Sequence, residues 1–353
     1  MNADFKKLIC VHLRKSASIF FFLLCVLTAC VPALPRVIKI GLVAPFEGRY
    51  RSIGYDAIYA ARLAVREINA AGGVNGWQLE LVAYDDRADL EMARAAARNL
   101  LTDPDVVAVI GHYRQETTAA AGEFYMAGEM PLIALGGWLT NTTGVWHLSP
   151  SPETLAARML TAAPVITPAT AALWGDGPLA AALAAQMPAQ GYRRIADGDG
   201  LPWPDVVFST LPPADAAERL AAPRAQGWAG ILVGDGDLLS PTFTAIAGDA
   251  AQAVYAVTPY PQPSTLPQLE AWTAAYRAVG PHVPDPGPYA LPTYEAVYVL
   301  SEALATATQF GLPTRSSVMM ALSGVRRVGM LGTVTWDMES SFWQDAPVYV
   351  YAP

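Results

Sequence analysis

The segment of residues 37–86 constrains the fold more than any other part of this sequence, because its pattern predicts a strand, a loop, a helix and a second strand. Residues 37–43 form an almost continuous apolar run, which is typical of a parallel strand covered by helices on both faces. From Tyr55 onward, apolar residues recur every three or four positions and predict a helix that ends at Gly72 and Gly73. Such a unit predicts a parallel sheet whose loops collect at its carboxyl edge, where ligands usually bind.

The alternation of strands and helices continues through the chain and predicts two α/β domains. A helix over residues 90–101, with Asp89 as its N-cap, and strands over 106–110 and 131–135 extend the first sheet. The pattern restarts near His147, and 353 residues are too many for one ordinary core, so we expect a second sheet beyond this point.

Residues 1–29 predict an export signal. Four basic residues precede an apolar run over 19–27, which is too short to span a bilayer as a stable helix, and small residues lead from it to Cys30. This arrangement resembles the lipobox of bacterial lipoproteins, in which the signal is cut before the Cys and the Cys then carries the lipid. An ordinary signal peptide with an incidental Cys is the alternative.

Charge and cysteine content limit the partners that the exported body can have. Removal of the signal takes away four basic residues and Asp4, so the net charge changes from −8 to −11, which disfavours nucleic acid as a partner. Cys10 and Cys25 leave with the signal and Cys30 would be acylated, so we expect no disulfide. The lipid on Cys30, rather than a basic patch, would hold the protein at a membrane.

Six short segments, spread in order across nearly the whole exported chain, share a family pattern. They are Gly54 with Ala61-Arg62-Leu63-Ala64; Ile68-Asn69-Ala70-Ala71-Gly72-Gly73-Val74-Asn75-Gly76; Tyr84-Asp85-Asp86; Val109-Ile110-Gly111-His112; Ala247-Gly248-Asp249-Ala250-Ala251; and Trp336-Asp337. Together they resemble the branched-chain amino-acid-binding (Leu/Ile/Val-binding) proteins, which are periplasmic solute receptors of ABC importers. The second segment is fairly specific to that family.

The resemblance implies the type I periplasmic-binding-protein fold, an α/β architecture in which two doubly wound lobes are joined by a three-crossover hinge and close on a solute. The crossovers would fall near residues 147–149, 258–261 and 329–332. The second lobe would be shortened relative to the family, because residues 192–204 read as a loop without a helix. The implied boundaries are 36–148 plus 260–330 for the first lobe and 149–259 plus 331–353 for the second.

In the family, the ligand carboxylate is held by a Ser after the third strand and by backbone and a Thr hydroxyl after the fourth. Gln115 and the cluster of Gly136, Gly137 and Trp138 occupy these positions, so an amide and backbone N–H groups would replace the hydroxyls. Trp138 either stacks on a ligand or fills the cleft. Arg114 either binds an acid through two hydrogen bonds or is solvated.

Two further candidates on the first lobe are Tyr113 and Ile53. Tyr113 either supports the same wall of the cleft or packs at a strand end. Ile53 stands on the entrance loop where relatives carry an aromatic residue, with Tyr50 as an alternative. His112 is expected to be structural, because the sequence shows no metal-ligand spacing around it.

The second lobe supplies, in the family, an acidic residue for the ammonium group of the ligand. Asp235 or Asp237 would take this role, since one extra residue leaves the register open between them. An Asp-Gly turn is an equally good interpretation of this stretch. Ser209 and Thr210 end the facing strand and would add hydroxyl groups.

The resemblance therefore implies a lipid-anchored, extracytoplasmic solute-binding protein of an ABC transporter, with an amino acid or similar small solute as ligand and an importer permease as partner. It would be held on the outer face of the cell membrane or lie in the periplasm. The alternatives are a ligand-sensing receptor for a signalling partner and a degenerate receptor that has lost binding. No nucleophile, base and orienting group come together in the sequence, so we expect no enzyme, and no motif calls for a cofactor or metal.

Overall fold

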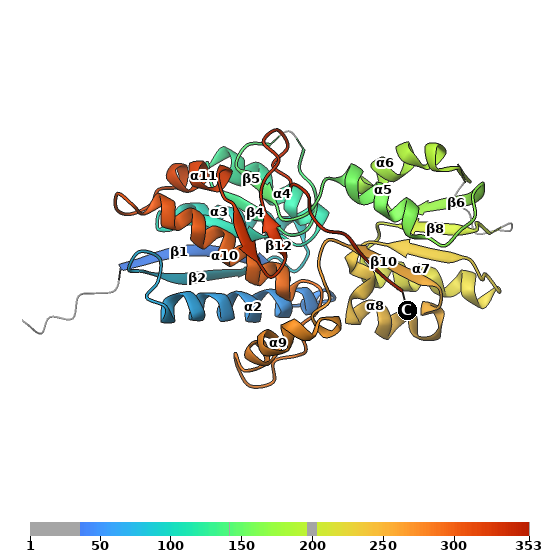
Figure 1. Ribbon diagram of the computed structural model, residues 1–353, viewed down its shortest axis with the longest axis horizontal. Helices are drawn as coiled ribbons and strands as arrows, with labels where there is room; N and C mark the ends of the chain where they lie inside the picture. Colours follow the sequence, from blue (N-terminus) through green and yellow to red (C-terminus); the bar gives the residue numbers. More distant parts are fainter. Residues whose placement is uncertain (1–35, 141, 196–202, 353) are drawn as a thin grey trace, which may run out of the picture. The chain divides into compact units, whose positions relative to one another are not determined.

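The computed structural model describes residues 36–140, 142–195 and 203–352, so the predicted signal segment and Cys30 lie outside the described residues. Two β-sheets organise the described chain, and each has helices on both of its faces (Figure 1). We call the sheet that contains β1 and the helices that pack on it the first lobe. The sheet that contains β6, with its helices, is the second lobe.

The first lobe is built on a sheet with the strand order β2-β1-β3-β4-β5, in which the pairs β1–β3, β3–β4 and β4–β5 are parallel. Its strands are β1 (Arg36–Ala44), β2 (Trp77–Asp85), β3 (Val106–Gly111), β4 (Leu132–Ala134) and β5 (Val145–His147). Its helices are α2 (Arg51–Ala70), α3 (Leu90–Thr102), α4 (Gln115–Ala127), η4 (Pro263–Thr265), η5 (Pro267–Leu269), α9 (Glu270–Arg277), α10 (Ala290–Ala307) and α11 (Arg315–Ser323).

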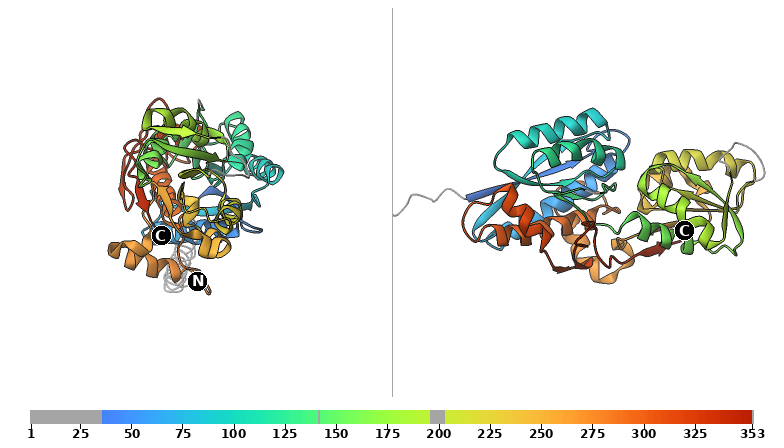
Figure 2. Two further views of the ribbon diagram at one scale, coloured as in Figure 1. Left: turned by 90° about the vertical axis from the view of Figure 1, so that its right-hand side faces the viewer. Right: turned by 90° about the horizontal axis from the view of Figure 1, so that it is seen from above.

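Strand β1 shows why this sheet forms at the centre of the lobe. Ile38, Ile40 and Leu42 belong to the core beneath α2 and α10, whereas Val43 belongs to the core beneath α3 and α4. The two helix layers lie on opposite faces of the sheet (Figure 2, right). The prediction of a parallel strand covered on both faces is therefore confirmed.

The second lobe is built on a sheet with the order β13-β10-β9-β8-β6-β7, which is parallel except for the antiparallel pair β10–β13. Its strands are β6 (Ala169–Trp174), β7 (Tyr192–Arg194), β8 (Val206–Ser209), β9 (Ile231–Gly234), β10 (Val254–Thr258) and β13 (Tyr349–Tyr351). Its helices are α5 (Pro152–Ala162), α6 (Gly177–Gln186), η1 (Met187–Gln190), α7 (Pro213–Ala225), η2 (Gly236–Leu239), α8 (Pro241–Ala247) and η3 (Gly248–Ala251).

The third passage between the lobes lies later in the chain than the sequence predicts. Strands β11 (Arg327–Gly329) and β12 (Gly332–Val334) form an antiparallel hairpin instead of a crossover at residues 329–332. Trp336 and Trp343 then bury their side chains in the core of the first lobe, and of the described residues 331–352 only β13 pairs with the second sheet. Because these two indoles are buried in the first lobe, the chain crosses to the second lobe only between Trp343 and β13.

Residues 192–204 also differ from the predicted loop. The first three of them form the edge strand β7, which pairs in parallel with β6. A strand of three residues is too short to show an alternating pattern, so the sequence gives no signal for it. Residues 196–202 lie outside the described residues. The predicted shortening of the second lobe depends on this segment and therefore stays a prediction.

No helix among residues 36–140, 142–195 and 203–352 is both long enough and apolar enough to cross a membrane.

Candidate functional site

One cleft is lined by both lobes. It is formed by the loops that follow β3 and β4 in the first lobe and β6, β8, β9 and β10 in the second, together with the segment before α10. The space open to the centres of water molecules is about 110 Å³, which is enough for several waters or for a small solute. The cleft therefore lies at the carboxyl edges of the parallel strands, where the opening segment of the sequence predicts a ligand.

Nine of the eleven residues singled out from the sequence line this cleft. They are Tyr113, Arg114, Gln115, Gly136, Gly137, Trp138, Thr210, Asp235 and Asp237. The other two do not line it. Ile53 is buried in the core of the first lobe, and Ser209 is buried at the end of β8, where its Oγ accepts a hydrogen bond from the N–H of Leu211.

Arg114 precedes α4 and is held by two neighbours. Its guanidinium lies 4.1 Å from the centroid of the Tyr50 ring, and its Nη2 lies 3.2 Å from an oxygen of Glu116. Only 11% of the Arg114 side chain is exposed, so its guanidinium is largely shielded from water. A cation over an aromatic face keeps its charge while it loses water, and it can still bind an anion in the cleft.

Gln115 and Trp138 bind each other. The Gln115 side-chain oxygen accepts the Trp138 backbone N–H at 2.7 Å, and its amide nitrogen lies 3.3 Å from the Trp138 carbonyl oxygen. The Trp138 indole N–H donates to the carbonyl of Pro150, and the ring packs against the core of the second lobe. These bonds use the Gln115 amide to fix the loop after β4, and they make Trp138 part of the cleft wall. A Cβ at Gly136 would overlap the Tyr113 carbonyl, so this close approach requires glycine.

Asp235 and Asp237 bring two carboxylates to the second-lobe side of the cleft. The Tyr289 hydroxyl donates to Asp237 Oδ1 at 2.6 Å, and the backbone N–H of Asp237 donates to Asp235 Oδ1 at 3.0 Å. Burial and the charge of Asp237 raise the pKa of Asp235. Burial also raises the pKa of Asp237, although the Tyr289 hydrogen bond opposes this shift. Both residues are partly exposed and line the cleft, so the choice between them that the sequence left open stays open.

Tyr289 is the most important cleft residue that sequence reasoning missed. Its backbone N–H and that of Gly287 donate to the two carboxylate oxygens of Asp56 on α2, at 3.2 and 3.0 Å. Its ring meets the Tyr113 ring edge to face, with centroids 5.5 Å apart. The Pro-rich segment before α10 has no periodicity, and its anchor lies more than 200 residues earlier, so the sequence carries no signal for this placement.

Two further lining residues, Asp176 and Tyr260, also lie in loops that follow strands. Asp176 lies two residues after β6, and the family resemblance did not point to it. Tyr260 follows β10, and its hydroxyl donates to the Leu148 carbonyl at 2.5 Å across two of the inter-lobe connections.

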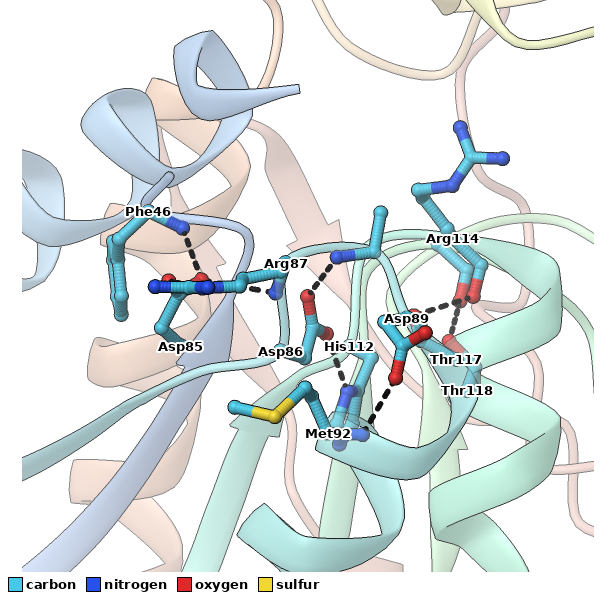
Figure 3. A network of polar contacts seen from close by, with 12 residues as sticks. Phe46, Asp85, Asp86, Arg87, Asp89, Met92, His112, Arg114, Thr117 and Thr118 are labelled. Carbon is cyan, nitrogen blue, oxygen red and sulfur yellow. Dashed lines mark hydrogen bonds and ion pairs between the residues drawn. The ribbon is translucent and has the colours of Figure 1, made fainter. Parts of the chain in front are cut away.

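A partly buried network of polar contacts joins the loops that follow β1, β2 and β3, the last of which carries Tyr113 and Arg114 (Figure 3). Asp86 Oδ2 lies 2.7 Å from His112 Nδ1, and His112 Nε2 lies 3.3 Å from the Tyr125 hydroxyl. Asp85 Oδ1 accepts the Phe46 N–H at 2.8 Å. His112 is fully buried, as a structural role requires, and the Arg114 guanidinium points away from this network.

A set of contacts that we call the entrance contacts joins the loop before α2 to the second lobe. Arg49 lies 3.2 Å from Asp215 and 2.6 Å from Glu218, both on α7. The Tyr50 hydroxyl lies 3.3 Å from Asp215. Tyr50 thus contacts the second lobe through its hydroxyl and Arg114 through its ring.

The cleft offers charged groups and aromatic side chains to a ligand. Across the described ranges, no group of three or more His, Cys, Asp or Glu side chains is arranged to hold a metal ion.

Comparison with known proteins identifies the family. The model of the periplasmic binding protein family matches residues 37–172 and 203–351. An amino acid binding protein of Pseudomonas aeruginosa is 36% identical over 104 residues, which are 30% of this chain and 27% of that protein. This chain thus aligns with about a quarter of the length of that relative. A leucine-specific-binding protein of Salmonella typhimurium is 26% identical over 306 residues, which cover 77% of this chain and 80% of the relative.

Solved structures show the same fold. The branched-chain amino acid transporter substrate binding protein LivJ of Streptococcus pneumoniae, in complex with isoleucine, has a TM-score of 0.73 at 20% identity and covers 90% of this chain and 96% of its own. A fatty acid ABC transporter substrate-binding protein of Thermomonospora curvata has a TM-score of 0.76 at 18% identity, with 90% and 88% covered. The type I periplasmic-binding-protein fold is therefore confirmed, and by the extent of the family match this chain belongs to the periplasmic binding protein family.

Proposed function

We propose that this protein is a lipid-anchored receptor of an ABC importer that binds an amino acid or a similar small solute in the cleft between its lobes. The family is extracytoplasmic, and its members bind solutes. The observation that carries the proposal is the placement of Arg114 from the first lobe and of Asp235 and Asp237 from the second around one cleft.

Groups of opposite charge on opposite lobes suit a ligand that carries both charges. The carboxylate of an amino acid would meet the Arg114 guanidinium, and its ammonium would meet Asp235 and Asp237. Because the two ends of the ligand would contact different lobes, binding would favour the closed arrangement, which is the hinge mechanism of such receptors.

The names of similar proteins fit this assignment without fixing the solute. The Pseudomonas relative is named for amino acids and the Salmonella relative for leucine, whereas a solved structure of the same fold is named for fatty acids. A fatty acid has no ammonium group, so it would leave Asp235 and Asp237 without a counter-charge in the cleft. The charged lining therefore favours an amino-bearing solute over an acid alone.

The anchor and the partner are the remaining parts of the proposal. Cleavage before Cys30 and acylation of its thiol would hold the receptor at the membrane that contains the permease. The permease would receive the solute from the closed cleft, so the protein itself would carry out no covalent chemistry.

Thermal-shift screening of the purified protein against the common amino acids tests the proposal, since a ligand that binds only the folded state raises its melting temperature. The substitutions R114Q and D237N should each weaken binding of the stabilising amino acid about 10- to 100-fold, as expected for loss of a charge-assisted hydrogen bond. Arg62→Gln and Asp249→Asn, which change exposed residues outside the cleft, should leave it unchanged. The proposal is wrong if no amino-bearing solute stabilises the protein.

A further inference from the structure

The ionisable side chains that line the cleft are mostly acidic. Among its described lining residues, Arg114 is the one Lys or Arg, whereas Glu116, Asp176, Asp235 and Asp237 are acidic. A receptor for a neutral amino acid needs one positive and one negative group, because its ligand carries one charge of each sign. This cleft holds three more acidic groups than such a balance requires.

The single cation is already compensated within the first lobe. Arg114 pairs with Glu116 at 3.2 Å, and its guanidinium lies against the Tyr50 ring. Among the described residues, Arg114 is the positive group that acts electrostatically on Asp235 and Asp237. Its ion pair, however, is with Glu116 and not with either of these two residues. The two carboxylates of the second lobe therefore have hydrogen-bond donors but no bound counter-charge within the described protein.

The contacts of Asp235 and Asp237 leave room for a cation. Each carboxylate accepts one hydrogen bond through its Oδ1 atom, from the Asp237 N–H and from the Tyr289 hydroxyl respectively. Both residues line the cleft and are partly exposed to it. Two neighbouring carboxylates repel each other in such a place, and an organic cation between them would remove that repulsion.

The walls of the cleft favour the same kind of ligand. Tyr113, Trp138, Tyr260 and Tyr289 all contribute to its lining. Aromatic faces attract cations and also accept alkyl chains, so they suit a ligand in which methylene groups separate charged nitrogen atoms. Arg114 on Tyr50 is an example of such a contact at the same site.

The groups that would hold a ligand carboxylate are weaker than in the family pattern. The hydroxyl residue expected after β3 is replaced by Gln115, and both ends of its amide bind the backbone of Trp138. Both ends of the Gln115 amide are therefore already engaged within the protein, so this side chain has less to offer a ligand carboxylate.

We propose that the cleft selects a cationic organic amine, such as a basic amino acid or an alkyl diamine, over neutral branched-chain amino acids, and that Asp235 and Asp237 determine this choice. The inference rests on the proposed function as a solute receptor and narrows its substrate class.

Calorimetric titration of the purified protein with L-lysine, 1,5-diaminopentane and L-leucine at one pH and ionic strength tests this inference. We expect L-lysine or 1,5-diaminopentane to bind at least tenfold more tightly than L-leucine. The variants D235N and D237N should each reduce the affinity for that cation at least tenfold. Asn keeps the carbonyl oxygen that accepts the existing hydrogen bond, so both variants should fold, which circular dichroism and thermal melting would verify. Asp249→Asn, which removes an exposed charge of the same lobe, is the matched control.

The outcomes separate this inference from the function on which it rests. Tight binding of L-leucine with weak binding of both cations would overturn the cationic specificity and leave a solute receptor in place. Binding of a cation that is equally strong in D235N, D237N and the control would also overturn it, because the cation would then bind elsewhere. If none of the three solutes binds and no other amino acid stabilises the protein, the proposed function fails as well. The comparison of L-lysine with L-leucine needs only the unaltered protein.

Discussion

Asp56 is a single buried side chain that sets the position of a residue in the cleft. It is 6% exposed, lies on α2, and accepts the backbone N–H groups of Gly287 and Tyr289. A Cβ at Gly287 would lie too close to its carboxylate, so the segment can approach Asp56 only with glycine at that position. Tyr289 in turn donates to Asp237. One carboxylate thus links the core of the first lobe to the acidic side of the cleft.

The titration of Asp56 should make stability depend on pH. Burial raises the pKa of Asp56 from 3.8 to about 7 in the folded protein. Between these two values the folded state keeps a proton that the unfolded state has lost, so the free energy of unfolding decreases as pH rises and levels off above about pH 7. The neutral variant D56N lacks this term. The amount by which its free energy of unfolding lies below that of the unaltered protein should therefore shrink by about 3 kcal/mol between pH 5 and pH 8.

Urea unfolding of both proteins at several pH values measures this difference. The raised pKa values of Asp235 and Asp237 act in both proteins and cancel in the comparison. A deficit that stays constant over the pH range would show that Asp56 titrates as an ordinary carboxyl group.

Residues of the cleft could be found from the sequence where a strand end marks them. Arg114, Gly136 and Asp235 follow apolar runs that predict strands, and the carboxyl edges of a sheet bring such positions together. The partner of a side chain could not be found in this way. The binding of Gln115 to Trp138 depends on how closely two loops approach, and Tyr289 depends on an anchor distant in the sequence.

Helix α3 begins at a cap that the sequence predicts and the structure confirms. Asp89 accepts hydrogen bonds from the N–H groups of Glu91 and Met92, which would otherwise lack partners inside the helix. The substitution D89A should lower the free energy of unfolding by about 1 kcal/mol. Chemical denaturation measures this loss, and N99A, an exposed position of the same helix, is the control that should show almost none. Equal effects of the two substitutions would contradict the capping role.

Elements with a long apolar period were predictable, whereas among the three-residue strands β4 was predicted and β5 and β7 were not. The sequence predicts β1, α2 and α3 because each has enough residues for its repeat to show. Strands β5 and β7 have three residues each and gain their stability from neighbours in the sheet. The segment of β11 and β12 was predicted to be a crossover but forms a hairpin, because burial of the Trp336 and Trp343 indoles in the first lobe decides where the chain crosses.

The entrance contacts tie the two lobes at the mouth of the cleft, and their loss should weaken ligand binding. Arg49 bridges to Asp215 and Glu218, and exposed ion pairs of this kind contribute at most about 1 kcal/mol each. We expect R49Q to reduce ligand affinity about two- to fivefold, because an open arrangement would be more populated. Calorimetry in low and high salt measures this, and the difference should disappear in high salt. An R49Q affinity that matches that of R62Q in low salt would rule out this role.

Membrane attachment should depend on Cys30 alone among the cysteines of the sequence. We expect C30S to move the protein almost completely from the membrane fraction of producing cells to the soluble extracytoplasmic fraction, since the acyl chains would have no thiol to carry them. Immunoblotting of the fractions measures this shift. C25S, which changes a residue of the signal, should leave attachment intact, and membrane retention of C30S at the normal level would mean that another segment provides the anchor.

The three passages between the lobes have a consequence for how the protein resists proteases. The chain passes from one sheet to the other after β5, after β10, and between Trp343 and β13. A cut in any one of these connections produces two fragments. One lobe is then still built from segments of both fragments, which its fold holds together. A nicked molecule would therefore stay assembled, and separation of the lobes would require cuts at all three connections.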